Sequence, residues 1–501
     1  MDLIPNDSHN QALVKDTHPA EWRNPLPTGR YNLVVVGAGT AGLVSAAGAA
    51  GLGAKVALIE RHLLGGDCLN YGCVPSKALI RAARSAAEVA RAGDFGVQVP
   101  PGSRVNFAAV MERMRRLRAG ISPHDSAERF RQLGVDVYFG DARFVGPTAI
   151  EVAGQRLEFA RGVIATGARA ADPGIPGLAE LGYLSNETVF SLTDLPRRLL
   201  VLGAGPIGCE LAQTFRRFGS EVHLIQRGPK ILPREDADAA AIIQRRFELE
   251  GLGMHLGVKV LRAEETESSK RLVGERDGRP WSLEGDAILV GVGRMANVEG
   301  LNLEAAGVRF DANGVHVDDR LRTSNSRIYA AGDICSTYKF THAADAMARI
   351  VLQNALFFGR KRVSSLVIPW CTYTEPEVAH VGLTEPEAAN RGLAVDTFTV
   401  ALDEVDRAIL DGETHGFARV HVYKGTDRIA GATIVGTHAG EMMGEITLAM
   451  TRRLGLGAIA ANIHSYPTQA EAIKKLGDLY QRTRLTPRVA AILRTILRWR
   501  R

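Results

Sequence analysis

The chain has 501 residues. A chain of this length is too long to fold around a single hydrophobic core, so two to four domains are expected. Hydrophobic residues make up 46% and charged residues 23%, which is ordinary for a folded globular protein. The formal net charge of +6 is a small bias over this length, and no basic-aromatic run suggests a nucleic-acid surface. Anionic cofactors and a basic tail account for the bias, so no nucleic-acid partner is expected.

The cysteine content and the first 30 residues indicate a reducing compartment. Five cysteines are too few, and odd in number, for a secreted disulfide scaffold. Residues 1–30 contain four prolines and no apolar segment of the signal-peptide kind, so we interpret them as a loose extension or one that orders on contact. No apolar run reaches the length of about 18 residues that a membrane-spanning helix needs. These features predict a cytoplasmic protein.

A dinucleotide-binding unit begins at residue 31. A β-branched strand over 31–36 runs into a glycine turn, a helix of small residues follows, and a second strand over 55–60 ends at Glu60. The turn contains Gly37, Gly39 and Gly42. These glycines allow the backbone to approach a pyrophosphate at a helix N-terminus, and a carboxylate at Glu60 can accept from ribose hydroxyls.

The next motif carries two cysteines. Residues 65–77 read Gly-Gly-Asp-Cys-Leu-Asn-Tyr-Gly-Cys-Val-Pro-Ser-Lys, so that Cys68 and Cys73 follow Gly66 and precede Lys77. This arrangement suits a redox-active dithiol held against a flavin. We expect both cysteines to start the following helix, whose N-terminus would lower the thiol pKa.

A second dinucleotide-binding unit follows a strand over 163–167 that ends in Thr166 and Gly167. It repeats the first pattern, with strands over 198–202 and 221–226 around a second glycine turn. That turn contains Gly203, Gly205 and Gly208. Two such units, each in the correct strand–helix context, are much more specific than one.

The residues after the second unit bear on the choice of nicotinamide. Gln226 occupies the position that Glu60 has in the first unit, and Arg227 follows it. A missing acidic ribose ligand and an available cation favour the 2′-phosphate of NADPH. Gly208 at the third glycine position is more usual in NAD sites, so both NADPH and NADH stay open.

The predicted pattern of secondary structure changes near residue 366. Before it, strands over 288–294 and 328–333 end at Gly293-Arg294 and at Gly332-Asp333. After it, short strands over 397–402, 417–423 and 429–435 alternate with helices, as in an α+β module.

Six ordered motifs together resemble the pyridine nucleotide–disulfide oxidoreductase family, which includes dihydrolipoamide dehydrogenase, glutathione reductase and mercuric reductase. The resemblance covers residues 31–482. The motifs are the two glycine turns, the cysteine block, Thr166-Gly167, Gly332-Asp333, and the segment from Pro467-Thr468 to Glu471.

The resemblance implies an α/β fold of two Rossmann-like domains and a C-terminal α+β dimerisation domain. It places FAD on 31–170 and 295–365, NAD(P)H on 171–294, and the dimerisation domain on 366–482. It also implies a homodimer in which the partner subunit completes each active site.

The resemblance further implies roles for single residues. Cys73 would lie against the flavin, and the more exposed Cys68 would meet the substrate. Lys77 would lie near flavin N5 with Glu210 as its partner. Two further cofactor contacts are implied at Asp333, on the FAD ribityl chain, and at Gly293-Arg294, where the chain returns toward the cofactors.

One position departs from the disulfide-reducing members of the family. Those members have a histidine directly before the Pro-Thr, paired with a glutamate that Glu471 matches, but here that position is Tyr466. A phenol has a pKa near 10 and does not shuttle protons at neutral pH as imidazole does. His464 lies two residues earlier, about 7 Å away along an extended segment, and is the alternative base.

Tyr466 favours a resemblance to mercuric reductases, which have a tyrosine at this position. In those enzymes soft thiolates bind a soft metal ion, a reaction that needs no proton shuttle. Cys68 and Cys73 would then be transient ligands of the metal substrate. The sequence shows no cysteine after Cys371 and no N-terminal Cys-x-x-Cys motif of the kind mercuric reductases carry, so metal delivery by their usual route is not expected.

The last segment, 483–501, predicts a basic amphipathic helix. Five apolar residues share one face and arginines lie on the other, so the helix suits an anionic membrane surface or docking on the dimer body. The apolar residues are Val489, Ile492, Leu493, Ile496 and Leu497.

The leading hypothesis is an FAD-dependent NAD(P)H oxidoreductase that passes electrons through Cys68 and Cys73 to Hg(II) or another soft metal ion. The alternatives are a disulfide reductase of the dihydrolipoamide or glutathione type, and a membrane-attached redox-sensing flavoprotein with little turnover.

Overall fold

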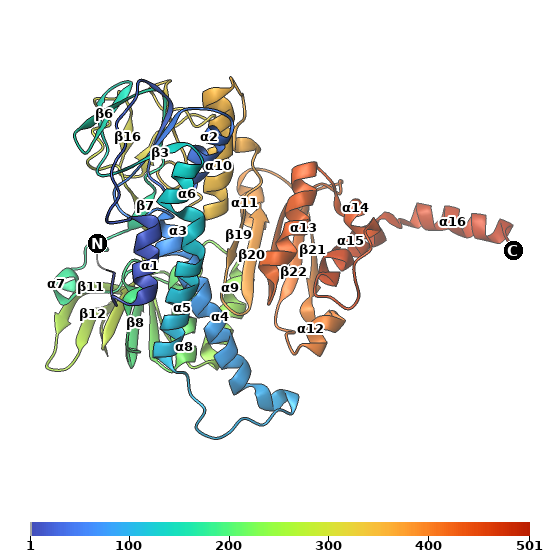
Figure 1. The fold of residues 1–501 in the computed structure, drawn as a ribbon. Coiled ribbons are helices and arrows are strands. Elements are labelled where there is room, and N and C mark those ends of the chain that lie inside the picture. Colours follow the sequence, from blue (N-terminus) through green and yellow to red (C-terminus); the bar gives the residue numbers. More distant parts are fainter. Residues whose placement is uncertain (1–2) are drawn as a thin grey trace. The chain divides into compact units, whose positions relative to one another are not determined.

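The computed structural model describes residues 3–501 and divides into two units (Figure 1). One unit comprises the chain up to Arg227 together with Leu252–Leu366, and the other comprises Gly228–Gly251 with Val367–Arg501. The first two residues of the expected N-terminal extension lie outside the described part. Among the residues described, no helix combines the length and the apolar character needed to cross a bilayer.

A seven-stranded sheet forms the core of the first dinucleotide-binding region. Its order is β3-β2-β1-β6-β5-β4, and β18 pairs with β6. β1, β2, β3, β6 and β18 run parallel, while β4 and β5 extend the sheet as antiparallel strands. The strands are β1 (Tyr31–Val36), β2 (Val56–Glu60), β3 (Val135–Phe139), β4 (Arg143–Gly146), β5 (Ala149–Val152), β6 (Gln155–Ile164) and β18 (Ile328–Ala330).

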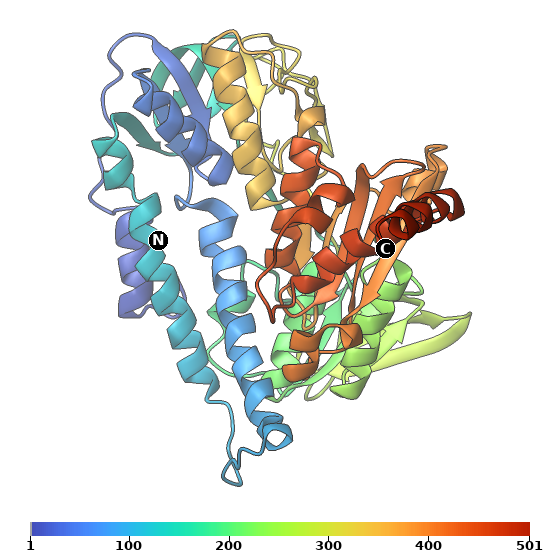
Figure 2. The same ribbon diagram turned by 90° about the vertical axis from the view of Figure 1, so that its right-hand side faces the viewer.

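Two helices, α2 (Thr40–Gly51) and α10 (Thr341–Leu356), lie side by side over one face of this sheet (Figure 2). Alternate residues of β1 divide between two cores. Leu33 and Val35 pack with the residues of α2 and α10, whereas Val34 and Val36 pack on the opposite face. The small residues of α2 allow this close approach to the sheet.

The N-terminal extension is ordered on the body of its unit. Helix α1 (Ser8–Thr17) packs on α5 (Phe107–Ile121), and its Leu13 is fully buried. The buried guanidinium of Arg118 donates to the side chain of Asn10 at 2.7 Å and to the carbonyl of Asn70 at 2.7 Å. Of the two interpretations, ordering on contact is therefore the correct one. Nearby lie α3 (Gly66–Asn70), α4 (Cys73–Ala90) and α6 (Ala127–Gln132).

The second dinucleotide-binding region has a parallel sheet of order β10-β9-β8-β14 and a three-stranded antiparallel sheet of order β11-β12-β13. Two short strands, β7 and β15, pair where the chain enters and leaves this region. The bounds are β7 (Ala168–Ala170), α7 (Leu178–Leu181), β8 (Arg198–Leu202), α8 (Pro206–Phe218), β9 (Glu221–Gln226), β10 (Gly253–Leu256), β11 (Val258–Glu265), β12 (Lys270–Arg276), β13 (Arg279–Gly285), β14 (Ala287–Val290) and β15 (Arg294–Ala296). The short pair β16 (Phe310–Asp311) and β17 (Gly314–Val315) follows in the chain and packs on the core of the first region.

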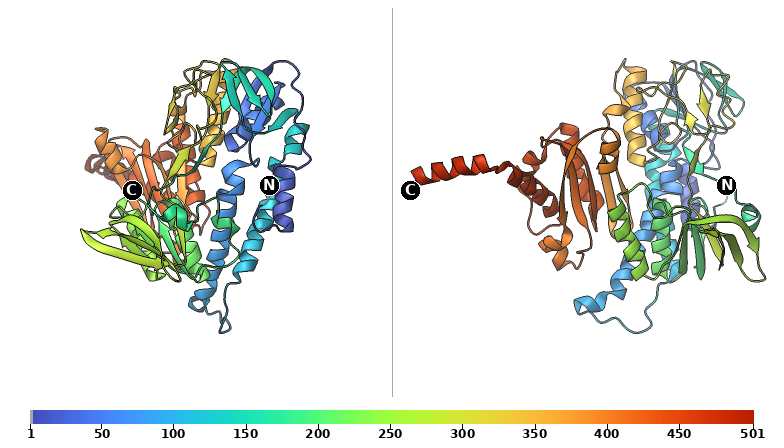
Figure 3. Two further views of the ribbon diagram at one scale, coloured as in Figure 1. Left: turned by 90° about the vertical axis from the view of Figure 1, so that its left-hand side faces the viewer. Right: turned by 180° about the vertical axis from the view of Figure 1, so that it is seen from behind.

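The second unit is built on a five-stranded antiparallel sheet of order β19-β20-β23-β22-β21, covered by helices α13 and α15 (Figure 3). Alternating buried residues such as Val420 and Ile434 form its core. The elements are α9 (Ala237–Leu249), β19 (Pro369–Thr372), β20 (Glu377–Gly382), α11 (Glu385–Asn390), β21 (Val395–Ala401), α12 (Asp406–Leu410), β22 (Phe417–Tyr423), β23 (Ile429–Gly436), α13 (Ala439–Arg452), α14 (Leu456–Ala461), α15 (Glu471–Arg484) and α16 (Pro487–Trp499).

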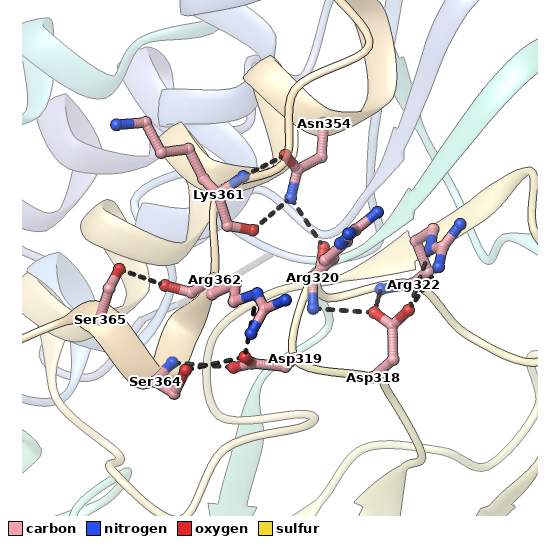
Figure 4. Close-up of polar contacts among 9 residues, drawn as sticks. All are labelled: Asp318, Asp319, Arg320, Arg322, Asn354, Lys361, Arg362, Ser364 and Ser365. Atoms are coloured by element: carbon pink, nitrogen blue, oxygen red, sulfur yellow. Dashed lines mark hydrogen bonds and ion pairs between the residues drawn. The ribbon is translucent and has the colours of Figure 1, made fainter.

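A polar network holds the C-terminal end of α10 (Figure 4). The buried amide of Asn354 donates to the carbonyls of Arg320 and Lys361 and accepts from the Lys361 N–H at 3.0 Å. Asp319 accepts from the N–H and the hydroxyl of Ser364 at 2.8 and 2.7 Å. These hydrogen bonds join the segment after α10 to the turn at 318–322 and so fix the C-terminal end of α10. The first residue of α10, Thr341, contacts Cys73 in the cysteine block.

Candidate active site

The cysteine block packs directly on the first glycine turn. Gly65 (φ +89°) precedes α3, and its N–H donates to the carbonyl of Ala38 at 2.9 Å. A Cβ on Gly66 would lie 2.6 Å from the Cα of Gly39, so only glycine permits this contact of two backbones. The block is thus held against the turn where a dinucleotide is expected to bind.

The two cysteines belong to different helices. Cys68 lies inside the short α3, whereas Cys73 is the first residue of α4, after the N-cap Gly72. The expectation that both begin one helix is therefore wrong, because the chain turns at residues 71–72. Only Cys73 has its sulfur at the N-terminus of a long helix.

The two thiols have opposite electrostatic character. A hydrogen bond from Cys68 lowers the pKa of Cys73 to about 6, and Thr341, whose Oγ1 lies 3.4 Å from the Cys73 sulfur, lowers it further. The same hydrogen bond raises the pKa of Cys68, and burial adds to the effect. Together with the place of Cys73 at the N-terminus of α4, these interactions favour the thiolate on Cys73. In the protein chain alone, Cys73 is exposed and Cys68 is half-buried.

The expected contact between Lys77 and Glu210 is present. Lys77 Nζ, on α4, donates to Glu210 Oε2, on α8, at 2.8 Å. The Glu210 side chain is 7% exposed and that of Lys77 is 37% exposed. The pair joins the helix that begins at Cys73 to the helix that follows the second glycine turn.

Arg294 connects the cysteine block to the position expected at the FAD ribityl chain. Its guanidinium forms an ion pair with Asp67, lies 3.5 Å from Asp333, and donates to the carbonyl of Ala168 at 2.6 Å. Burial raises the pKa of Asp333, an effect that Arg294 opposes. Asp67 was not predicted as a site residue, although its place directly before Cys68 in the sequence could have indicated it.

The first glycine turn fits a dinucleotide. A Cβ on Gly37 would overlap the carbonyl of Ala165, and one on Gly42 would overlap that of Gly37, so both are required by the fold. Gly39 has an ordinary φ of −77° and would meet only Gly66, at 3.8 Å, so a Cβ there would fill open space beside the N-terminus of α2. Glu60 accepts from the Ala38 N–H at 2.7 Å, and burial raises its pKa.

The second glycine turn repeats this geometry. Gly203 (φ +99°) and Gly208 are required by close backbone contacts, whereas a Cβ on Gly205 would meet no atom within 4 Å. The open space beside the N-terminus of α8 suits a pyrophosphate. Gln226 accepts from the Ala204 N–H at 3.2 Å, as Glu60 does from Ala38, and Arg227 is exposed beside it. An uncharged amide therefore replaces a carboxylate at the ribose position.

The two segments of the first dinucleotide-binding region, on either side of the second region in the chain, meet in a reciprocal contact at Thr166. Its hydroxyl donates to the carbonyl of Asn297 at 2.9 Å, and the Asn297 amide donates to the Thr166 carbonyl at 2.8 Å. Gly167 (φ +67°) and Gly293 (φ +145°) adopt backbone conformations that favour glycine on either side of the β7–β15 pair. Asn297 was missed by the sequence analysis and had no motif to indicate it.

No hydrogen bond or ion pair joins Tyr466, Glu471 and His464 to one another within residues 3–501. Tyr466 is 71% exposed, and its hydroxyl donates to Asp406 at 2.8 Å, a bond that raises the pKa of the phenol. Glu471 forms an ion pair of 3.5 Å with Lys475, and its second, buried oxygen has no hydrogen-bond partner in the described structure.

His464 is held away from that position. Its Nε2 lies 2.9 Å from Glu445, its Nδ1 lies 3.4 Å from the carbonyl of Asn462, and its side chain is 7% exposed. Both ring nitrogens are thus engaged in fixing the loop. This geometry does not favour His464 as the alternative base.

A resident metal centre is not indicated in the described part of the chain, because no three His, Cys, Asp or Glu side chains come together there as ligands would. The two thiols would be ligands of a metal substrate only.

Comparisons with known proteins identify the family of the chain. Residues 31–348 match the family model described as pyridine nucleotide-disulphide oxidoreductase, and residues 368–476 match the dimerisation domain of the same family. The chain is 35% identical over 447 residues to a mercuric reductase of Staphylococcus aureus, covering 89% of this chain and 82% of the relative.

Two further similar proteins are named for other activities than mercuric reduction. A dihydrolipoyl dehydrogenase of Bacillus subtilis is 31% identical over 464 residues, covering 88% of this chain and 96% of the relative. The Cu(II) complex of the HOCl-induced flavoprotein disulfide reductase RclA from Escherichia coli is similar in structure, with a TM-score of 0.79 and 26% identity, covering 90% of this chain and 100% of that one.

Proposed function

Because the chain belongs to the pyridine nucleotide-disulphide oxidoreductase family, whose members use FAD and NAD(P)H, we propose that it reduces a soft metal ion, Hg(II) or one of similar chemistry, through Cys68 and Cys73. Bound FAD supplies two-electron transfer between the nicotinamide and sulfur. The residues of the first glycine turn, with Glu60 and Asp333, would hold it.

The net reaction balances without a proton shuttle. NAD(P)H and Hg(II) give NAD(P)⁺, Hg(0) and one proton; with Cu(II), two ions would each gain one electron and give two Cu(I) ions. In the step at sulfur, two thiolates lose one electron each and form the Cys68–Cys73 disulfide, and Hg(II) gains both electrons. A disulfide acceptor instead needs protons delivered to its leaving thiolates.

The observation that carries the proposal is the pairing of Tyr466 with Asp406 at the position where a disulfide reductase has its histidine. The phenol is bound to a carboxylate that raises its pKa further, so it stays protonated at neutral pH. A polarised thiol pair without an imidazole suits a soft metal ion better than a disulfide. The Cu(II) complex of the Escherichia coli relative, which is named a disulfide reductase, is an example of metal-ion binding by a protein of similar structure.

For the nicotinamide we propose NADPH rather than NADH. Gln226 offers a neutral amide where a carboxylate would repel a 2′-phosphate, and the exposed Arg227 is available to it.

A disulfide reductase of the dihydrolipoamide or glutathione type is the second candidate. The dihydrolipoyl dehydrogenase relatives and the retained Glu471, with its unpartnered buried oxygen, favour it.

The deciding experiment measures NADPH and NADH oxidation by the purified holoenzyme with Hg(II), Cu(II), lipoamide, glutathione disulfide and quinones. We expect turnover with the metal ions, abolished in Cys73→Ser and unchanged in Cys209→Ser, a buried cysteine of α8. Turnover with disulfides alone would overturn the proposal, as would full metal reduction by Cys73→Ser.

The dimerisation domain supports a homodimer. We propose in addition that each active site is shared between the subunits, and that the enzyme is cytoplasmic and contacts the membrane periphery through α16.

A further inference from the structure

Helix α16 projects away from the rest of its own unit (Figures 1 and 3). None of its residues is buried. Its apolar residues recur with the spacing i, i+3, i+4, i+7, i+8, which places them on one side of the helix. Their exposed fractions are 40% for Val489, 59% for Ile492, 45% for Leu493, 47% for Ile496 and 61% for Leu497.

The opposite side and the flanks of α16 are cationic. Arg488, Arg494 and Arg498 lie off the apolar stripe, and Arg500 and Arg501 follow the last turn. From Leu479 to Arg501 the chain has seven arginines and no acidic residue, while the formal net charge of all 501 residues is +6. The positive charge of this protein therefore resides in this segment, and the remainder is close to neutral.

The helix begins and ends at defined points. The Thr486 hydroxyl caps it by accepting from the Val489 N–H at 3.3 Å, and Pro487 occupies the first turn, where its missing N–H costs nothing. Trp499, 91% exposed, is the last helical residue. An indole at this position suits the interface between water and lipid, where one edge stays wet.

We propose that α16 is a membrane-contact helix that lies in the surface of an anionic lipid bilayer, with the apolar stripe among the acyl chains and the arginines at the headgroups. Charge complementarity and the width of the apolar face favour lipid over a protein surface, which would have to cover five apolar side chains and accept an acid-free cationic flank. The inference deepens the proposed peripheral location and does not depend on the acceptor.

The stretch between α15 and α16 suits such a contact. Only Leu485 and Thr486 separate the two helices. Two copies of α16 in a homodimer would bind one surface together, which raises the affinity of an individually weak contact.

The test is flotation of the purified holoenzyme with vesicles of phosphatidylcholine alone and of phosphatidylcholine mixed with an equal amount of phosphatidylglycerol. We expect binding to the mixed vesicles only. The double variant Ile492→Glu/Ile496→Glu should weaken it at least about tenfold. Arg494→Gln/Arg498→Gln should weaken it by about tenfold at low salt and little at high salt.

A matched control places the same substitution on exposed apolar residues elsewhere. Leu249→Glu/Leu261→Glu, at side chains 62% and 42% exposed, should bind vesicles as the wild type does. Trp499 should shift its fluorescence to shorter wavelength on the mixed vesicles, and Trp499→Phe should lose that shift.

Equal binding to both kinds of vesicle, no binding, or undiminished binding by the Ile492/Ile496 variant would overturn the inference. A change of native mass in that variant, without vesicle binding by the wild type, would show that α16 covers a second copy instead. NADPH oxidation should be unchanged in all these variants, so a failed flotation leaves the proposed reaction intact.

Discussion

Cys73 and Cys68 differ in their surroundings although only four residues separate them. Cys73 lies at the start of a long helix with Thr341 beside it, and Cys68 lies in a separate short helix and donates to it. The polarity of this pair follows from the turn at residues 71–72, and it makes Cys73 the thiolate.

The pH dependence of alkylation tests this polarity. The Cys73 pKa is lowered from 9.0 to about 6, so we expect iodoacetamide to modify Cys73 of the reduced protein readily at neutral pH. The rate should fall as the pH drops through about 6, because the thiolate gains its proton there. Thr341→Val should move the profile to higher pH, and Thr341→Ser should not. Preferential labelling of Cys68 would contradict the assignment.

Tyr466 and Glu471 show how one substitution changes the chemistry of a loop. The carboxylate remains, with a buried oxygen that has no hydrogen-bond partner in the part of the chain that is described, while the phenol turns to Asp406. The glutamate of the proton-transfer pair is therefore present, but the histidine that would carry the proton is not.

Replacing the phenol tests that interpretation. We expect Tyr466→His to raise lipoamide or glutathione disulfide turnover, because Glu471 is available to orient the imidazole. General acid–base catalysis contributes about 10²- to 10⁴-fold, so an increase of at least about tenfold is expected. Tyr466→Phe serves as the control and should show no such increase. If Tyr466→His leaves disulfide turnover unchanged, the tyrosine does not decide the acceptor.

At the scale of elements, α1 supports the cysteine block. The Thr17 carbonyl at its C-terminus accepts from the Leu64 N–H at 3.1 Å, and Arg118 joins Asn10 of α1 to the carbonyl of Asn70 in the block. An extension that precedes the first dinucleotide-binding unit thus packs on the loop that carries the chemistry.

Truncating the buried leucine of α1 measures this support. Leu13 is fully buried, so we expect Leu13→Ala to lower the free energy of unfolding by about 2–5 kcal/mol. Lys15→Ala, on the exposed face of the same helix, should change it by less than about 0.5 kcal/mol. Urea unfolding of both variants is the measurement. Equal midpoints would show that α1 contributes nothing to the fold.

At the scale of the whole molecule, the β7–β15 pair brings together the two chain segments that enter and leave the second dinucleotide-binding region, and the Thr166–Asn297 contact lies beside it. The dimerisation domain contains the separate sheet of the second unit. The exposed Tyr466 and the thiol pair belong to different units. We propose that the partner subunit brings them together.

Subunit complementation tests the shared site. Suppose that Cys73→Ser and Tyr466→Ala are each inactive as homodimers. Dissociating and reassociating an equal mixture should then restore about a quarter of the wild-type rate, because half of the dimers would contain one intact site of two. Reassociated homodimers serve as the control. No recovery, with mixed dimers verified by mass, would contradict a shared site.

Much of the fold was predictable because it rests on local patterns. The strands expected over 31–36, 198–202, 221–226 and 417–423 coincide with β1, β8, β9 and β22. The strand expected over 288–294 is instead two strands, β14 and β15, because the glycine-rich turn at 291–293 interrupts it. The hydrophobic pattern indicates which face of a strand is buried. It does not indicate that the strand is interrupted at 291–293 so that β15 can pair with β7.

The candidate site was predictable where a motif carries it and not where distant segments meet. Both glycine turns, the cysteine block and the contact of Lys77 with Glu210 were expected. Three other contacts were not predicted, because each joins residues that are far apart in the chain. They are those of Asp67 with Arg294, Asn297 with Thr166, and Asp406 with Tyr466.

The amino-acid sequence by itself determined the family, the two dinucleotide-binding turns, the dithiol and the amphipathic character of the last helix, because each depends on the chemistry and spacing of neighbouring residues. Only the tertiary structure decided which cysteine bears the charge, what Tyr466 and His464 bind, and whether the N-terminal extension is ordered. Those properties depend on burial and on partners from distant segments, and no local pattern records them.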